Sequence, residues 1–402
     1  MRAREAARIQ PRGHAMRYAI VTETFPPEIN GVALTVASAA DGLRRRGHDV
    51  EVIRPAQGGE APGSGAGSLR VRGCPLPRYP GLRFGLPCGR RLLAHWRDTP
   101  PDAIYVATEG PLGWSALRAA RRLGIPAATG LHTRFDQYMR SYGLGLLEDA
   151  ALRWMRRFHA QGTVTLVPTR ELADLLARRG FAHVERLPRT VDCARFTPAS
   201  RDPGLRRTWG LGPRDVAVLH FGRLAPEKNL GLAVRAFHAI AQHWAGPGRV
   251  RMVWVGDGPE RGALEAAHPD HVFCGLRTDA ALARHVASCD LFLFPSTSET
   301  FGNVVLEAMA CGVPTVAFDR GAAREHLRHG IDGACVDDDA AFVREAVRIA
   351  LDDDRRLHMG AAARAAMEAL DGDAMVGAYE AALMRIARAA KPELPRLAGV
   401  RP

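Results

Sequence analysis

The 402-residue sequence has few cysteines, and it contains no long apolar run. Its seven cysteines stand in unlike contexts without a Cys-x-x-Cys pair, which indicates neither a zinc site nor a disulfide framework and fits a reducing cytoplasm. No apolar stretch approaches the roughly 18 residues of a membrane-spanning helix, and the charged N-terminus lacks the apolar core of a signal peptide. We therefore expect a cytoplasmic protein with at most a peripheral position on the inner face of the membrane.

Lysine is also scarce. Among 55 basic residues only Lys228 and Lys391 are lysine, and the formal net charge is +12. This charge predicts an anionic partner, which the composition leaves open among nucleotide phosphates, anionic lipid and nucleic acid. Because an ammonium group is a compact point charge and a guanidinium group is a broad fork, a lysine at 228 suggests a site that needs the compact group, although chance can also leave one there.

A chain of this length is expected to form two domains of roughly 150–200 residues each. Strand-like and helix-like segments alternate through both halves, which predicts an α/β fold with parallel sheets. Met16 directly precedes a strand-like run, so it competes with Met1 as the true start, and the Gly- and Ser-rich residues 56–68 are expected to form a flexible surface loop. The predicted division is an extension over 1–15, a first domain over 16–197, a second domain over 198–375, and a final helix and tail over 376–402.

The most informative stretch follows an apolar run over 291–294 that is typical of a buried strand. After it come turn residues and a helix from about Gly302 to Ala310. Glu299 precedes the helix start, where free N–H groups gather and can bind an oxygen-rich ligand, and Glu307 lies eight residues further on. The plain alternative is that Glu299 only caps the helix and Glu307 is solvated.

Further candidate anion sites occur at other strand-to-helix turns. Arg223 and Lys228 flank a tight loop before a predicted helix, where two cations beside a helix N-terminus would bind a diphosphate; the alternative is ordinary surface charge. Gly31 stands at the turn after the first strand, where a glycine lets the backbone approach a phosphate, although this turn is weak evidence alone. The pair Gly256 and Gly258 lacks the third glycine of a dinucleotide fingerprint.

These motifs resemble those of a known enzyme family. The segment Ser-Glu-Thr-Phe-Gly over 298–302, with Glu307, resembles the Glu-x7-Glu motif of retaining glycosyltransferases of family four, and the pattern Gly-Arg-x4-Lys-Asn over 222–229 resembles their pyrophosphate motif. The resemblance spans about residues 17–390, and over 108–143 the chain looks similar to bacterial GDP-mannose-dependent α-mannosyltransferases acting on glycolipids. It implies the GT-B fold, in which two Rossmann-like domains face each other across a cleft and a C-terminal helix crosses back to the N-domain.

The resemblance also implies roles for individual residues. His132, which as a lone histidine would ordinarily be structural, is implied to lie against the transferred sugar. No metal is implied, and the aspartate runs 337–339 and 352–354 are interpreted as charges at helix N-termini. Arg134 and Thr190 stand where many relatives have a small polar residue and a glycine, which leaves the acceptor side and one local turn in doubt. The implied catalytic residues are His132, Arg223, Lys228 and Glu299, and the implied contacts to the nucleotide sugar are Gly31, Arg223, Lys228, Gly275, Leu276, Phe301, Gly302, Asn303, Val304 and Glu307.

Several alternatives remain open from the sequence. The donor is expected to be GDP-mannose, with a UDP-sugar as the alternative, and the acceptor is a glycolipid or a saccharide. The segment over 298–302 disfavours a nucleotide-sugar epimerase, and the lack of a cofactor-lysine environment disfavours a phosphorylase. A non-catalytic, arginine-rich protein that binds nucleic acid or anionic membrane is the other class; its arginines are spread along the chain without a nucleic-acid motif, so no nucleic-acid partner is expected. The basic, aromatic residues 78–97 are equally compatible with contact to anionic lipid and with a solvated helix that buries its aromatic residues.

Overall fold

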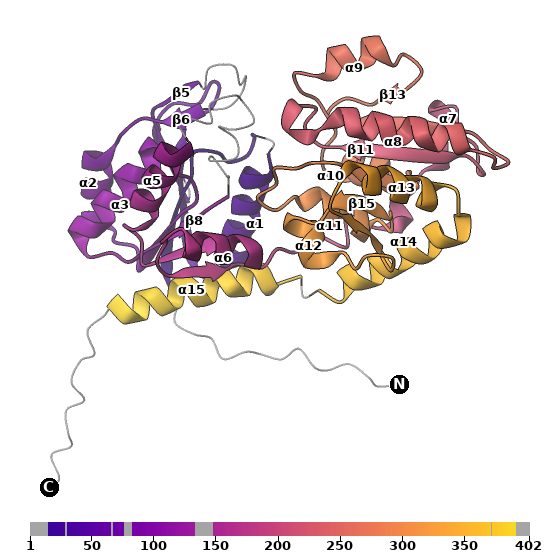
Figure 1. The fold of residues 1–402 in the computed structure, drawn as a ribbon. Coiled ribbons are helices and arrows are strands. Elements are labelled where there is room, and N and C mark those ends of the chain that lie inside the picture. Colours follow the sequence, from indigo (N-terminus) through magenta and orange to yellow (C-terminus); the bar gives the residue numbers. More distant parts are fainter. Residues whose placement is uncertain are drawn as a thin grey trace, which may run out of the picture.

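The computed structural model describes residues 15–28, 30–65, 67–75, 83–132, 148–370 and 372–390. It forms two α/β halves, which lie side by side in Figure 1. Residues 1–14 of the predicted extension, Tyr79 and Arg134 lie outside the described residues, so the structure does not test the predictions made for them. Within the described residues, no helix combines the length and apolar character needed to cross a bilayer.

The first half is built on an eight-stranded sheet that is parallel except for one edge strand. Its strands are β1 (Arg17–Val21), β2 (Asp49–Pro55), β3 (Gly63–Gly65), β4 (Ser68–Val71), β7 (Ala103–Val106), β8 (Ala127–Gly130), β9 (Val164–Val167) and β10 (Val184–Arg186), in the order β10-β9-β8-β7-β1-β2-β4-β3. Its helices are α1 (Gly31–Arg45), α2 (Gly89–Asp98), α3 (Pro111–Leu123), α5 (Glu148–His159) and α6 (Arg170–Arg178), and a small hairpin joins β5 (Gly73–Pro75) to β6 (Arg83–Gly85).

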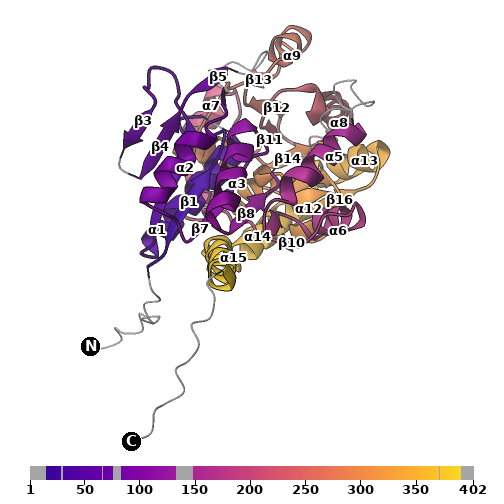
Figure 2. The same cartoon turned by 90° about the vertical axis from the view of Figure 1, so that its left-hand side faces the viewer.

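The alternation of side chains along β1 sends apolar residues to both faces of this sheet, as expected for a buried parallel strand. Tyr18 and Ile20 pack with α1 on one face, whereas Ala19 and Val21 pack with α2 and α3 on the other. In Figure 2, α2 and α3 lie in front of the sheet. Both faces are therefore covered, and the functional groups must lie at the ends of the strands.

Two expectations for the first half need correction or refinement. Residues 56–68 are not entirely a flexible loop, because β3 and β4 pair within and beyond this segment and extend the sheet. Glycine and serine suffice there because edge pairing uses backbone groups. Of the aromatic residues in the basic stretch, Trp96 is only 1% exposed and belongs to the core, whereas Phe84 is half-buried in β6.

The second half has a six-stranded, fully parallel sheet in the order β13-β12-β11-β14-β15-β16. Its strands are β11 (Val216–Phe221), β12 (Val250–Val255), β13 (Val272–Phe273), β14 (Leu291–Phe294), β15 (Thr315–Phe318) and β16 (Gly333–Val336). Its helices are α7 (Pro203–Thr208), α8 (Leu230–His243), α9 (Arg261–Ala267), α10 (Asp279–Ala287), α11 (Asn303–Ala310), α12 (Gly321–His326), α13 (Asp339–Ala350) and α14 (Asp353–Glu368), with short 3-10 turns at η2 (Pro198–Ser200) and η3 (Pro226–Lys228).

The last helix, α15 (Ala374–Ala390), returns to the first half, as the resemblance implied. Its apolar side chains, including Tyr379 and Leu383, join the core cluster of β1 and α1. The approach is close enough that a β-carbon on Gly42 would lie 2.4 Å from Val376 Cγ2, so α1 requires glycine at that position. The α/β fold class, the parallel sheets and the crossing helix are thus confirmed.

Candidate active site

The two halves meet at the N-termini of α1 and α11. Gly31 begins α1 after the β1 loop, and a β-carbon placed on it would lie 3.7 Å from Asn303 Nδ2 at the start of α11. In Figure 1 these helices face each other across the junction. The structure thereby brings together residues that are more than 250 positions apart in the sequence and that were assigned to the same ligand.

Each of these helix ends carries backbone N–H groups with no partner inside the helix. Gly302 adopts φ 92°, a left-handed conformation that favours glycine, and turns the chain into α11 without a side-chain cap. On α1, Asn30 caps the helix by accepting from the backbone N–H of Ala33 at 2.9 Å. The N-terminus of α11, with the first-turn amides of Asn303 and Val304, therefore faces the N-terminus of α1. The positive ends of two helix dipoles meet there, which favours binding of an anion.

Lys228 lies at the end of η3 and donates to Glu299 Oε1. Ser296 Oγ donates to the same oxygen at 2.7 Å. The side chains of Lys228 and Glu299 are only 20% and 12% exposed, so the pair is shielded from water and from screening by salt. Two further protons of the Lys228 ammonium and the second oxygen of Glu299 stay available for a ligand.

The loop that carries Arg223 is fixed by close backbone packing. Leu224 N donates to Asp257 O at 2.9 Å and Gly222 N donates to Val255 O at 3.0 Å. A β-carbon on Gly256, whose φ is 147°, would lie 1.9 Å from Gly222 O. The Gly-x-Gly turn therefore serves to support the half-buried Arg223 loop, a role that its sequence pattern alone did not reveal.

Glu307 lies on α11, where the neighbouring Leu306 and Met309 are buried. Burial raises the pKa of the Glu307 carboxyl to about 7, and the Arg195 guanidinium opposes this shift. The Glu307 side chain is half-buried, and within the described residues no hydrogen bond engages its carboxyl group. It is thus suited to accept hydrogen bonds from ligand hydroxyl groups.

The loop after β13 provides an apolar surface at the same side of the second half. Gly275, with φ 69°, accepts from Gly256 N at 3.0 Å, which ties this loop to the turn under Arg223. Leu276 follows and is 52% exposed. Asp279 begins α10 and accepts from Arg195 Nη1 at 3.1 Å. Arg195 therefore contacts Asp279 and also acts electrostatically on Glu307.

His132 lies two residues after the end of β8 and is held on both ring nitrogens. Arg189 Nη2 donates to His132 Nδ1 at 2.7 Å, so the proton of the neutral ring is on Nε2, which lies 2.7 Å from the hydroxyl of Tyr105. Tyr379 OH from α15 lies 3.2 Å from Tyr105 OH. Burial and the Arg189 charge hold the pKa of His132 well below its usual range. A side-chain hydrogen bond from His132 to a sugar would require one of these contacts to break.

The remaining sequence candidates are placed as follows. Phe301 is buried and its carbonyl accepts from Ala322 N at 2.6 Å, so its contribution to a ligand site is to fix the Glu299 loop. The aspartate runs are confirmed at helix starts, because Asp338 accepts from Ala341 N at 2.8 Å and Asp352 accepts from Arg355 N at 2.9 Å. Sequence reasoning missed Tyr105, Arg189, Arg195, Ser296 and Tyr379, which carry no local motif.

A cluster of three histidines, His238, His268 and His271, has ring nitrogens within 4.8 Å of one another. Trp254 Nε1 donates to His271 Nδ1 at 3.1 Å, which places the proton of neutral His271 on Nε2 and removes that lone pair. A metal-ligating histidine ordinarily donates its second N–H to an acceptor, whereas Trp254 supplies a donor. This arrangement does not fit a metal, and we assign none to it.

Comparison with known proteins agrees with the fold. A profile described as Glycosyltransferase Family 4 matches residues 29–195, and one described as Glycosyl transferases group 1 matches residues 215–353. The chain is 37% identical over 382 residues to a GDP-mannose-dependent alpha-mannosyltransferase of Mycolicibacterium smegmatis, covering 92% of this chain and 98% of the relative. It is 34% identical over 354 residues to the protein of the same description in Corynebacterium glutamicum, covering 87% and 84%.

Solved structures share the architecture. Sucrose-phosphate synthase from Thermosynechococcus elongatus aligns with a TM-score of 0.75 at 18% identity, covering 94% of this chain and 100% of that one. Anabaena HepE in complex with UDP and glucose aligns with a TM-score of 0.69 at 20% identity, covering 92% and 100%. The fold and these comparisons define a glycosyltransferase of the GT-B class. More specifically, the chain belongs to glycosyltransferase family four, whose group 1 profile covers its second half.

Proposed function

We propose that this glycosyltransferase transfers mannose from GDP-mannose to a hydroxyl group of a glycolipid or saccharide, with retention of the anomeric configuration and without a metal ion. The observation that carries the proposal is the meeting of two helix N-termini next to Lys228, which provides positive charge where a diphosphate would leave. The description of the relatives in Mycolicibacterium and Corynebacterium supports GDP-mannose as the donor.

In the proposed reaction, the bond between the anomeric carbon and the diphosphate oxygen breaks while the acceptor oxygen bonds to that carbon from the same face. The proton of the acceptor hydroxyl passes to the departing diphosphate, which leaves as GDP. Arg223, Lys228 and the amides near Gly31 stabilise the negative charge that develops on the diphosphate. Glu299 and the first-turn amides of α11 hold the sugar, and Glu307 accepts from the ribose hydroxyls. His132 is proposed to shape the sugar site as a neutral ring fixed by Tyr105 and Arg189.

The base site favours guanine over uracil in this proposal. Leu276 offers an exposed apolar surface next to the loop of Gly275, and Asp279 is a carboxylate at the same edge. Guanine presents two neighbouring N–H groups, on N1 and N2, that one carboxylate can accept together, whereas uracil presents a single N–H. Asp279→Asn is therefore expected to weaken GDP binding more than UDP binding.

The transfer reaction is tested with purified protein, GDP-mannose and an alkyl hexoside acceptor in the presence of EDTA. We expect an α-mannoside, identified by NMR at the anomeric position, and undiminished turnover with the chelator. An inverted β-product or a strict need for a divalent ion would contradict the proposed mechanism. UDP-glucose in place of GDP-mannose tests the donor in the same assay.

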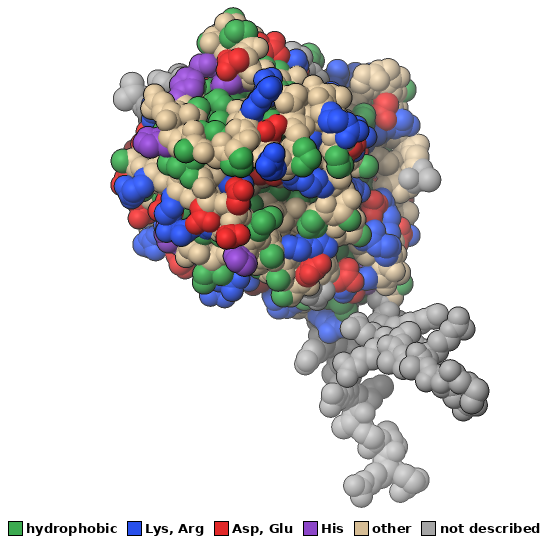
Figure 3. Space-filling view, turned by 90° about the vertical axis from the view of Figure 1, so that its right-hand side faces the viewer, with side chains coloured by type: hydrophobic (Ala, Val, Ile, Leu, Met, Phe, Trp, Pro, Cys, Tyr) green, Lys and Arg blue, Asp and Glu red, His purple; other side chains and the backbone are tan. Residues whose placement is uncertain are grey.

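A glycolipid acceptor would require contact with a membrane surface. Exposed arginines gather on the two neighbouring helices that cover one face of the first half, α2 and α3. By contrast, basic and acidic side chains are interspersed on the face of the second half shown in Figure 3. We propose that the first face contacts anionic lipid headgroups. Its exposed arginines are Arg90, Arg91 and Arg97 on α2 and Arg118, Arg121 and Arg122 on α3.

Co-sedimentation with phosphatidylglycerol vesicles tests this surface. Replacing Arg118 and Arg121 by glutamine is expected to lower binding, by about 1 kcal/mol for each arginine near the surface. The matched control replaces Arg235 and Arg344, exposed arginines of the second half. Equal loss in both double variants would show that net charge, and not this face, determines binding.

A further inference from the structure

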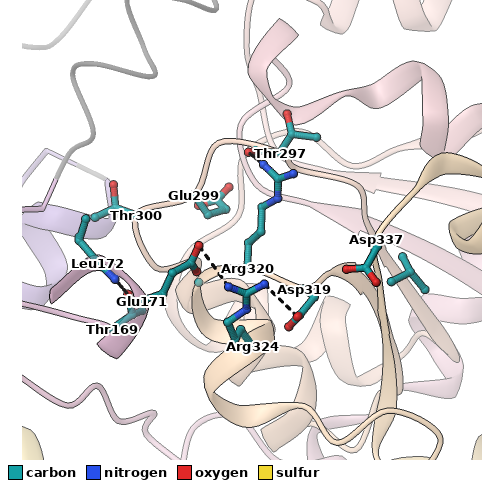
Figure 4. A pocket seen from close by; sticks show the side chains of 12 residues that line it. Thr169, Glu171, Leu172, Thr297, Glu299, Thr300, Asp319, Arg320, Arg324 and Asp337 are labelled. Carbon is teal, nitrogen blue, oxygen red and sulfur yellow. Dashed lines mark hydrogen bonds and ion pairs between the residues drawn. The ribbon is translucent and has the colours of Figure 1, made fainter. Parts of the chain in front are cut away.

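A polar cavity lies between the two halves, next to the Glu299 loop. It has a volume of about 210 Å³, and Figure 4 shows side chains from both halves around it. Thr169 and Glu171, at the start of α6, come from the first half, whereas Asp319, Arg320, Arg324 and Asp337 come from the second. Asp337 belongs to the aspartate run assigned from the sequence to a helix start, and no local motif marked these residues as parts of one site.

The charges of the cavity favour a neutral ligand that is rich in hydroxyl groups. Both of its arginines are already used by the protein: Arg320 Nη1 donates to Thr297 O at 2.8 Å, and Arg324 pairs with Asp319 at 3.0 Å and with Glu171 at 3.4 Å. In the described part of the chain no hydrogen bond engages the Asp337 carboxylate. What the cavity offers is mainly carboxylate oxygens, which accept hydrogen bonds from hydroxyl groups and repel anions.

The cavity also has the position that an acceptor site needs. Glu299 borders it and simultaneously contacts Lys228, so one carboxylate separates the proposed donor site from the cavity. Its walls exist only when the halves are together. Glu325 on α12 holds them there, because its carboxylate accepts from Arg170 N and from Arg186 Nη1 of the first half, each at 2.7 Å. This carboxylate is only 9% exposed.

We propose that this cavity is the subsite for the sugar ring of the acceptor, so that the acceptor is itself a neutral glycoside whose non-reacting hydroxyls bind Glu171, Asp319 and Asp337. This inference rests on the proposed function. It adds to that function the place of the acceptor sugar and the expectation that this sugar is uncharged. A lipid alcohol without a sugar would leave the carboxylates unmatched, whereas a neutral hexose, free or linked to a lipid, would satisfy them.

The test measures steady-state transfer from GDP-mannose to octyl glucoside, octyl galactoside and octyl mannoside, with octanol as the acceptor without a sugar. The wild type is expected to use at least one hexoside and to use octanol at least 100-fold less efficiently. Asp337→Asn and Glu171→Gln are expected to raise the KM for the hexoside about ten-fold, since a hydrogen bond to a charged group is lost or weakened. The control is Glu185→Gln, which removes an exposed ion pair with Arg385 outside the cavity.

Two readouts separate this inference from the proposed function. GDP binding and slow hydrolysis of GDP-mannose without acceptor should be unchanged in Asp337→Asn and Glu171→Gln; their absence in the wild type would defeat the proposed donor site instead. Unchanged hexoside KM in both variants, or octanol used as well as every hexoside, would overturn the acceptor subsite. The same hexose is then presented on diacylglycerol in vesicles. A lower KM on vesicles would identify a glycolipid as the acceptor, whereas an unchanged KM would identify a free saccharide.

Discussion

Removal of the Lys228 charge separates catalysis from stability more clearly than any other change. Lys228→Met keeps a long apolar stem. It leaves the Glu299 carboxylate, which is 12% exposed, with Ser296 as its remaining hydrogen-bond donor among the described side chains. Loss of a donor to a largely buried charged group is expected to lower the free energy of unfolding by about 1–3 kcal/mol. Loss of positive charge at the departing diphosphate is expected to lower kcat by about 10²–10⁴-fold.

The double variant Lys228→Met/Glu299→Gln distinguishes the two effects. A neutral amide no longer needs the ammonium, so most of the lost stability should return, measured by urea denaturation. Turnover should stay low, measured by release of GDP from GDP-mannose with a hexoside acceptor. Arg235→Met is the matched control, because its ion pair with Asp339 is more than half exposed and far less important. Near-normal turnover in Lys228→Met would refute the assignment of this lysine to the diphosphate.

Three further predictions use other parts of the molecule. Arg223→Ala is expected to lower turnover about 10²–10⁴-fold with little change in the midpoint of urea unfolding, and near-normal turnover would remove it from the site. Glu325→Gln should weaken the closed arrangement, seen as a larger radius of gyration in small-angle scattering with GDP present; an unchanged radius would show that other contacts hold the halves. Burial raises the pKa of Glu23 to about 7, so the folded state binds more protons than the unfolded state between pH 4.5 and 7 and loses stability as pH rises through that window, by about 3 kcal/mol. Urea unfolding of Glu23→Gln at pH 5 and pH 7.5 should lack this loss of stability. An identical dependence of stability on pH in the wild type and in Glu23→Gln would show that Glu23 is not its cause.

Much of the architecture followed from local patterns in the sequence. Uninterrupted apolar runs such as 291–294 indicated buried parallel strands, and glycine with proline after 310 marked the end of α11. The aspartates before α13 and α14 were correctly placed at helix starts, because N-capping is a short-range effect. Sheet pairing of Gly63 to Val71 was missed, since edge strands held by backbone groups need no apolar side chains.

The contacts that shape the candidate site were harder to foresee. Lys228 and Glu299 were each identified, but their mutual ion pair depends on how two loops meet across 71 positions of the chain. The support of His132 by Tyr105 and Tyr379 joins a strand to a helix that is 274 residues further along. The acceptor cavity depends on the approach of the two halves. Such contacts arise from tertiary packing, which periodicity and spacing do not encode.

Calorimetric titration of GDP and UDP tests whether the nucleotide-sugar site on α11 prefers GDP. We expect GDP to bind more tightly than UDP, Glu307→Ala to lose this binding, and Glu185→Gln to retain it. Because burial raises the pKa of Glu307 to about 7 and the ionised carboxylate is the better acceptor for ribose hydroxyls, GDP affinity should be higher at pH 8 than at pH 6. Binding of neither nucleotide, or unchanged GDP binding by Glu307→Ala, would contradict the account.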